Sequence, residues 1–357
     1  MTALRHGNTD ITYKASDIKL RKKEERTMTR EIDYAVMDPT GNITILVETP
    51  VPEASQPFVA DQLMKLEPEA EQVGFLTLPP AGAERDSVPG AAESAAEHAA
   101  DITPRLSLRM AGGEFCGNAS MSAAVHAVLL EEKKQDDVLL NVSGAAEPVR
   151  VQVRECGGDP SAAALSAGAA RRFHGTVEMP RPVRIREVRL PLEETAPEIA
   201  GRAGTEIPAA VIPAVEFEGI THLIIAETGE VTVKTEEEQG KNTAAVWIRR
   251  NAEKLAPAWC RMLGAEALGL MFLNEKEGTM TPLVYVPAAG TLVWENSCAS
   301  GTTAAGAYFS RRNSGGPLRL ELRQPGGSLE ISAGADGRLF LGGTVRLLRR
   351  RRARLAL

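Results

Sequence analysis

Two cysteines stand in closely similar surroundings, 182 residues apart in the chain. Cys116 lies in the segment Glu114–Ala119, and Cys298 lies in the segment Glu295–Thr302. Each follows a run with the pattern of a strand and precedes a run of small and polar residues that is typical of a helix start. The recurrence of strand, acid, cysteine and helix predicts a degenerate internal repeat, with one copy in each of two domains.

The predicted position of each cysteine at the first turn of a helix indicates what the thiols can do. The first N–H groups of a helix have no partner within it and carry about half a positive charge, so they can bind a carboxylate. The same field stabilises a thiolate, and we therefore expect both thiol pKa values to be lowered. Small residues let a ligand approach this backbone, and polar residues can cap the helix. The small residues are Gly117, Ala119, Ala299 and Gly301, and the expected caps are Asn118, Ser300 and Thr302.

Two such helix starts facing each other would hold a substrate α-carbon between two sulfurs. A thiolate on one side removes the α-proton, and a thiol on the other side delivers a proton to the opposite face, which inverts the configuration. The helix amides stabilise the charge that develops on the substrate carboxylate. The pair therefore predicts a racemase or epimerase with the catalytic residues Cys116 and Cys298, without a metal or another cofactor. Cys156 and Cys260 lack this setting, and we interpret Cys260 as a core residue.

The composition limits the class of protein. A chain of 357 residues, with 43% hydrophobic and 25% charged residues, is typical of a soluble protein of two domains. The net charge of −6 disfavours a nucleic acid as partner. We expect no membrane span, because no apolar run of about 18 residues occurs. We expect a cytoplasmic location, because the N-terminus lacks the apolar core of a signal peptide.

The rest of the chain predicts the elements that position these residues. Residues 1–31 are interpreted as an N-terminal extension and residues 79–104 as a surface insertion. The helix after Cys116 is expected to bury one face, and the helix over 243–263 to bend or break at its internal proline. The basic tail Arg346–Arg354 is interpreted as a solvated or frayed end, with a phosphate or membrane contact as the alternative. Further strands are expected over 43–47, 73–78, 106–110, 149–153, 176–179, 211–226, 283–286 and 292–294, and a further helix over 58–66.

The two cysteine segments also carry a resemblance to a known family. Met110–Ala119 and Trp294–Thr302 resemble the two active-site motifs of the diaminopimelate epimerase and proline racemase superfamily. The resemblance covers about Tyr34 to Val345 and implies an α+β fold of two pseudo-symmetric domains, each a β-barrel-like sheet around a central helix. It implies an N-terminal domain over 32–182 and a C-terminal domain over 183–338, with the last strand, 339–347, returning to the first domain. The other segments that resemble family elements are Thr40–Asn42, Gln72–Phe75, Val177–Pro180 and Gly219–His222.

The same resemblance implies roles for residues around the cysteines. Three further candidates for substrate binding each have a structural alternative. Asn42 could line the site or only hold its turn, and His222 could shape the site or be a satisfied histidine at a strand end. Glu295, like Glu114, could orient the substrate or cap a helix. The backbone amides that would bind the substrate carboxylate are those of Gly117, Asn118, Ala299 and Ser300.

Two departures from diaminopimelate epimerases bear on the substrate. Those enzymes have a Glu-Arg-Gly element before the second cysteine, whereas Tyr285–Gly290 carries no charge here. Ile220 replaces the asparagine expected two residues before His222. The sequences of several segments are more similar to those of the histidine racemases of opine-type metallophore biosynthesis. This resemblance implies histidine as the substrate. These segments are Pro39–Val47, Glu114–Ala119, Pro282–Pro287, Trp294–Cys298 and Gln324–Ser328.

Other functions remain open at this point. The resemblance also allows a diaminopimelate epimerase, an isomerase that shifts a double bond in an unsaturated acid, and a ligand-binding homologue without catalysis. A thiol protease is disfavoured, because no histidine lies in an obvious partner position and neither cysteine matches a known local signature. For partners, the sequence predicts a small-molecule amino-acid substrate, and the resemblance allows a homodimer.

Overall fold

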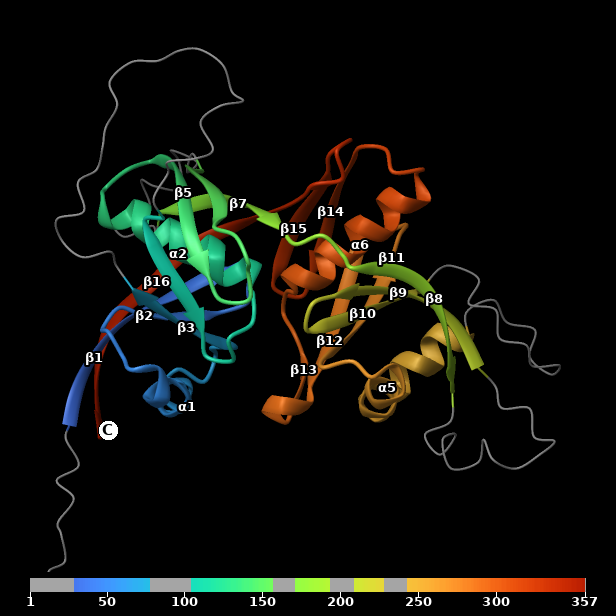
Figure 1. Ribbon diagram of the computed structural model, residues 1–357, viewed down its shortest axis with the longest axis horizontal. Helices are drawn as coiled ribbons and strands as arrows, with labels where there is room; N and C mark the ends of the chain where they lie inside the picture. Colours follow the sequence, from blue (N-terminus) through green and yellow to red (C-terminus); the bar gives the residue numbers. More distant parts are fainter. Residues whose placement is uncertain (1–28, 78–103, 157–170, 193–208, 228–242, 357) are drawn as a thin grey trace, which may run out of the picture.

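The computed structural model describes residues 29–77, 104–156, 171–192, 209–227 and 243–356, in which the strands form one continuous sheet that curls into two halves (Figure 1). In the first half, seven strands pair in sequence order, and the C-terminal strand β16 pairs with both β7 and β1. These pairings close an eight-stranded barrel. Its strands are β1 (Thr29–Pro39), β2 (Thr44–Val47), β3 (Gln72–Thr77), β4 (Leu106–Met110), β5 (Gln135–Val142), β6 (Val149–Glu155), β7 (Arg172–Met179) and β16 (Leu339–Ala356).

The second half repeats the order of pairing. From β9 to β14 the strands pair antiparallel, parallel, antiparallel and parallel, as they do from β1 to β5. The fold is therefore α+β with two pseudo-symmetric halves, as the sequence predicts, while the domain boundaries at 31, 182 and 338 stay a prediction. The strands are β8 (Arg184–Pro191), β9 (Ala209–Phe217), β10 (Ile220–Ala226), β11 (Leu268–Asn274), β12 (Thr279–Val286), β13 (Thr291–Trp294), β14 (Leu318–Gln324) and β15 (Gly327–Ala333).

One long helix lies inside each half. The helix α2 (Gly117–Leu130) is enclosed by the first barrel, and α6 (Ala299–Arg312) packs on the inner face of the second sheet (Figure 1). Side chains of both helices belong to one hydrophobic cluster, so the core is continuous where the halves meet. The helices α1 (Gln56–Leu66) and α5 (Thr243–Leu263) pack in two separate clusters on the outer faces.

The expectation that the helix after Cys116 buries one face is wrong. Every residue of α2 from Gly117 to Val128 is buried. The helix is rich in alanine and serine, whose narrow side chains let the surrounding strands approach it closely, and Met121 and His126 are the larger buried side chains among its residues. The strands of the first half contribute the larger apolar groups.

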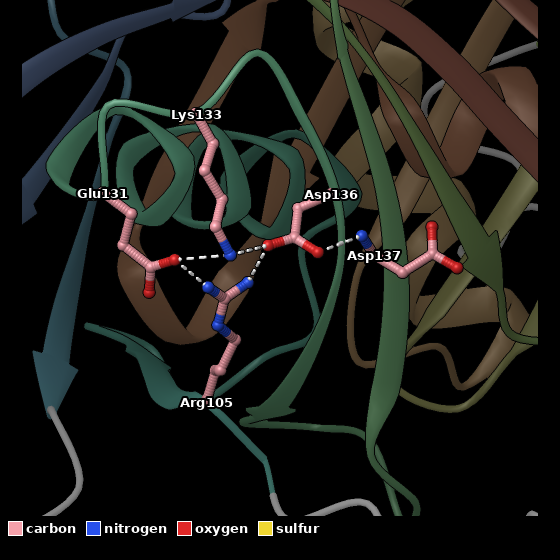
Figure 2. Close-up of polar contacts among 5 residues, drawn as sticks. All are labelled: Arg105, Glu131, Lys133, Asp136 and Asp137. Carbon is pink, nitrogen blue, oxygen red and sulfur yellow. Dashed lines mark hydrogen bonds and ion pairs between the residues drawn. The ribbon is translucent and has the colours of Figure 1, made fainter. Parts of the chain in front are cut away.

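A cluster of charged side chains holds the C-terminal end of α2, remote from Cys116 (Figure 2). Arg105 precedes β4 and pairs with Glu131, and its Nη1 donates to Asp136 Oδ2 over 2.6 Å. Lys133 contacts Glu131 Oε2 at 2.9 Å and Asp136 Oδ2 at 2.8 Å. The four groups alternate in sign and are partly shielded from solvent, so they fix the helix end to the starts of β4 and β5.

The helix α5 runs without interruption through Pro257, so the predicted break is wrong. A proline inside a helix removes one hydrogen bond and crowds the preceding turn. Leu255, Ala256 and Trp259 are fully buried against the second sheet, and this packing holds the helix together on both sides of the proline.

Of the interpretation of Arg346–Arg354 as a solvated or frayed end, the frayed part is wrong, while several of the arginine side chains are exposed. These residues belong to the part of β16, from Val345 to Ala356, that pairs with β1. Arg352 makes a fork to Asp33, with Nε to Oδ1 at 2.5 Å, and Arg349 pairs with the buried Glu67. The acidic residues of the first half thus neutralise the tail. β1 begins at Thr29, so the last three residues of the predicted extension over 1–31 lie in a strand.

Among the described helices, none is both long enough and apolar enough to cross a membrane. The predicted surface insertion over 79–104 falls outside the described residues except for Pro104.

Candidate active site

Each of the two cysteines is the N-cap of its helix, directly before the first turn in which the sequence predicts it. Cys116 has φ −133° and ψ 115° before α2, and Cys298 has φ −122° and ψ 108° before α6. The carbonyl of Cys116 accepts the N–H of Ser120 at 2.9 Å, and the carbonyl of Cys298 accepts the N–H of Thr302 at 3.0 Å. The backbone therefore places both sulfurs at a helix start, beside N–H groups that have no intrahelical partner.

The two helix starts lie against each other. Asn118 Nδ2 in α2 donates to the carbonyl oxygen of Ser297, directly before Cys298, over 3.5 Å. A Cβ atom placed on Gly117 would lie 3.2 Å from the Cβ of Ala299, so the glycine allows the close approach of α2 to α6. Cys116 and Cys298 are both free thiols.

The thiol of Cys116 is held by an amide side chain. Its Sγ donates to Gln72 Oε1 over 3.1 Å and accepts the N–H of Ala119 over 3.4 Å. Gln72 is fixed in turn, because its Nε2 donates to Asn42 Oδ1 at 2.6 Å and to Thr44 Oγ1 at 2.7 Å. In the sequence, Gln72 stands out only as part of a strand motif. The parallel pairing of Thr44 with Gln72, which brings this side chain into the site, is not visible in the sequence.

Asn42 lies at the centre of this network and is buried. Its Oδ1 accepts hydrogen bonds from Gln72 and, at 3.1 Å, from Asn118 Nδ2. Its Nδ2 donates to Glu71 Oε2 over 2.5 Å. The interpretation that Asn42 only holds its turn is therefore wrong. Asn118 does not cap α2 as expected, because its side chain faces Asn42 and the second cysteine segment.

Cys298 has different neighbours. Its backbone N–H donates to Gln324 Oε1 over 2.9 Å, and Gln324 Nε2 donates to Thr302 Oγ1 over 2.8 Å. Its Sγ lies 3.6 Å from Ser300 Oγ, and burial and the nearby carboxyl of Glu295 raise the thiol pKa. Glu295 thus lies near the reactive atom instead of capping α6. Ser300 and Thr302 make no cap either, because α6 has no side-chain cap at its first turn.

Burial dominates the electrostatics of the site. It raises the pKa of Cys116 to about 12 and the pKa of Cys298 well above its ordinary value. It also raises the pKa of Glu295 to about 7, and the negative charge of Glu71 adds to that effect. The expectation of lowered thiol pKa values is therefore wrong. The free energy needed to remove a thiolate from water is larger than the stabilisation that the helix amides give it.

His222 is completely buried in β10, and its pKa is lowered to about 3 by that burial, so the imidazole is neutral. Within the described part of the chain, neither ring nitrogen has a hydrogen-bond partner. The interpretation of a satisfied histidine is therefore wrong. Ile224, two residues along the strand, packs in the cluster that contains α6, so His222 faces the α6 side of the sheet.

The site thus combines two thiols with a partly buried carboxyl group and two helix starts. These groups can exchange protons and can bind a carboxylate at the helix amides. No group of three His, Cys, Asp or Glu side chains that could hold a metal ion occurs among the residues that the structure describes.

Comparison with known proteins places this geometry in context. The family model described as the histidine racemase CntK N-terminal domain matches residues 31–341. A histidine racemase of Fusobacterium nucleatum is 27% identical over 323 residues, which are 89% of this chain and 94% of that protein. A histidine racemase of Staphylococcus aureus is 24% identical over 303 residues, 85% of this chain and 88% of that protein.

Solved structures support the same fold. A phenazine biosynthesis protein of the PhzF family from Bacillus anthracis superposes with a TM-score of 0.56 at 11% identity, over 91% of this chain and 99% of that one. A predicted epimerase from Pseudomonas aeruginosa superposes with a TM-score of 0.52 at 14% identity, with the same coverage. At these identities the likeness concerns the fold alone.

Proposed function

The chain belongs to the histidine racemase family, and we propose from this premise that it interconverts L- and D-histidine by proton transfer between Cys116 and Cys298. It is an isomerase of the racemase and epimerase class. The observation that carries the proposal is the contact between two helix starts, each of which has a cysteine at its N-cap position. Cysteine thiols in that position are suited to removing and returning one proton at a substrate α-carbon.

In the proposed reaction, the substrate carboxylate binds the backbone amides that follow the two cysteines. The N–H groups of Gly117 and Asn118 would bind it from one side, and those of Ala299 and Ser300 from the other. One sulfur removes the α-proton while the other thiol protonates the opposite face. The amides stabilise the enolate-like charge in between. No cofactor takes part in this scheme.

The raised thiol pKa values mean that a thiolate must be formed with help from its surroundings. The ammonium group of the substrate supplies a positive charge beside the sulfurs, which favours the thiolate. Glu295 lies near the Cys298 thiol and has a pKa raised to about 7, so it is suited to accept the thiol proton near neutral pH. Gln72 orients the Cys116 thiol but cannot accept its proton.

One further feature supports histidine over diaminopimelate, and another indicates how the substrate is bound. The segment that ends β12 and continues through the short helix Pro287–Ala289 has no charged side chain to bind a second amino-carboxylate end. His222 brings a buried, neutral imidazole with two unpartnered nitrogens to the α6 side of the second sheet. We propose that it binds the polar groups of the substrate, because a buried unpartnered group is costly unless a ligand satisfies it.

The biological setting is part of the same proposal. We propose that the protein acts in the cytoplasm as a homodimer, on a small-molecule substrate and without a nucleic-acid partner, and that its product serves metallophore biosynthesis. Light scattering on the purified protein tests the dimer directly, and a single monomer mass would refute that part.

The activity is tested by incubating the protein with a panel of single L-amino acids in deuterated buffer. We expect D-histidine to form and to carry deuterium at the α-carbon. Diaminopimelate and an aconitate-like acid serve as comparison substrates, and a Cys116→Ala sample serves as the blank. Racemisation of another amino acid but not histidine would refute the substrate, and absence of isotope exchange with every acid would refute the reaction.

A further inference from the structure

A carboxylate outside the sequence-predicted site joins the two cysteine segments. Glu71 Oε2 accepts a hydrogen bond from Asn42 Nδ2 over 2.5 Å, and its Oε1 accepts one from Asn296 Nδ2 over 2.6 Å. Asn42 belongs to the network around Cys116, whereas Asn296 lies two residues before Cys298. The two oxygens of one side chain therefore connect groups that approach from opposite halves.

The other contacts near this connection are long or made by backbone alone. Asn118 reaches the Ser297 carbonyl only at 3.5 Å. Gly41 and Gly326 touch through their backbones, so close that a Cβ on either would collide with the other. An ionised acceptor forms stronger hydrogen bonds than a neutral one. The two bonds to Glu71 are accordingly the strongest polar connection in this group of contacts.

We propose that Glu71 is a positioning residue that holds the two cysteine segments together and so closes the active site. The inference rests on the proposed function for its catalytic meaning, but its structural part stands on the contacts alone. Glu71 touches neither sulfur, and it acts through Asn42 on one side and Asn296 on the other.

The two asparagine donors explain why position 71 carries a carboxylate. Asn42 Oδ1 already accepts hydrogen bonds from Gln72 and Asn118, so the amide cannot turn round without losing both. Its Nδ2 must therefore meet an acceptor. A carboxylate presents one oxygen to each asparagine, whereas an alanine at this position would leave both donors without this partner.

Glu71 also lies close to the groups that interact with each of the two thiols. The next residue, Gln72, accepts a hydrogen bond from the Cys116 thiol. Across the contact, the charge of Glu71 contributes to the raised pKa of Glu295, and Glu295 in turn contributes to the raised pKa of Cys298. Loss of Glu71 should therefore change the pH dependence of the reaction as well as its rate, which a residue with only a local structural role would not do.

The test measures how fast iodoacetamide alkylates Cys298, followed by mass spectrometry of the intact protein and its peptides. Cys298 is only 5% exposed, so it reacts when the halves separate. Cys260 is 2% exposed in a different hydrophobic cluster and reports global unfolding in the same sample. We expect Glu71→Ala and Asn296→Ala each to accelerate alkylation of Cys298 by about fivefold, the typical net effect of one hydrogen bond.

The double variant distinguishes a shared contact from two separate defects. If Glu71 and Asn296 act through one bond, Glu71→Ala/Asn296→Ala reacts no faster than Glu71→Ala alone. Glu69→Ala is the matched control, because Glu69 lies in the same loop but pairs with Arg349 within the first half, and it should leave the rate at Cys298 unchanged. An unchanged rate in Glu71→Ala, or an equal rise at Cys260, would overturn the proposal.

An activity measurement completes the test. In Glu71→Ala we expect kcat/KM for histidine to fall by at least about fivefold, and the acidic limb of the pH profile to move to lower pH, because Glu295 loses a neighbouring negative charge. A lower rate without that movement would contradict the coupling. If the wild type racemises no amino acid, the proposed function fails, while the alkylation result still decides whether Glu71 holds the halves together.

Discussion

The two cysteines share a backbone setting but differ in the side chain that lies near each thiol. Cys116 donates to the amide of Gln72, whereas the pKa of Cys298 is raised by burial and by the nearby carboxyl of Glu295. Both are N-caps with nearly the same dihedral angles. The repeated fold therefore places both sulfurs in the electrostatic field of a helix N-terminus. The neighbouring side chains, Gln72 and Glu295, differ between the two halves and make the thiols chemically different.

The difference indicates unequal roles in proton transfer. An amide can orient a thiol but cannot take its proton, whereas a carboxyl group with a pKa of about 7 can exchange a proton near neutral pH. Cys298 with Glu295 is thus the pair that can reset its protonation state locally. Cys116 depends on Gln72 for its orientation and on the bound substrate for its ionisation.

Removing either thiol should have the largest effect. Cys116→Ala and Cys298→Ala are each expected to lower kcat/KM for racemisation by at least about 10³-fold, because each takes away the acid or base of one face. A chiral chromatographic assay measures this, and Cys156→Ala, outside the site, is the control. Substantial racemisation by either alanine variant would show that only one cysteine takes part.

Replacing the carboxyl near Cys298 by an amide, like the one that contacts Cys116, should have the next largest effect on activity. Glu295→Gln is expected to lower kcat/KM by about 100-fold, since the variant cannot accept the Cys298 proton. The wild-type carboxyl, with its pKa raised to about 7, is ionised above that pH, so wild-type activity should fall as the pH drops through about 7. Rate profiles between pH 5.5 and about 8.5 test this, and a Glu295→Gln variant that keeps the same inflection would contradict the assignment.

His222 should affect substrate binding more than stability. His222→Phe is expected to raise KM for histidine by about tenfold, because one or two substrate hydrogen bonds are lost. The melting temperature should stay equal or rise, because the variant no longer buries two unpartnered nitrogens. Steady-state kinetics and calorimetry on one preparation separate the two effects. A lower melting temperature with an unchanged KM would assign the residue to the core instead.

The far ends of the two helices extend the comparison to stability, where the smallest effect is expected. The end of α2 is held by the ion cluster of Figure 2, and the end of α6 by Arg312, which pairs with Glu275 at 2.9 Å. Arg105→Met should lower the free energy of unfolding by about 1 kcal/mol with kcat/KM unchanged, because its pairs are partly buried. Arg150→Met removes an exposed pair with Asp137 and should change stability less. Urea titration measures both, and a loss of activity in Arg105→Met would mean that the cluster reaches the active site.

The sequence by itself was sufficient for the two cysteine-capped helix starts, because the signals for them are local. A strand pattern, an acidic residue, a cysteine and a run of small residues occur within about a dozen positions, and their recurrence indicated the pseudo-symmetric fold. The α+β class and the family followed from the same segments.

Tertiary structure decided everything that depends on contacts between distant segments. The approach of Gln72 to Cys116 requires the pairing of β2 with β3, and the link from Glu71 to Asn296 joins the two halves. The basic tail became a strand because β1 lies beside it. The direction of the thiol pKa shifts was likewise set by burial, which arises only when the barrel encloses the helix and the halves meet, and which here outweighs the local helix field.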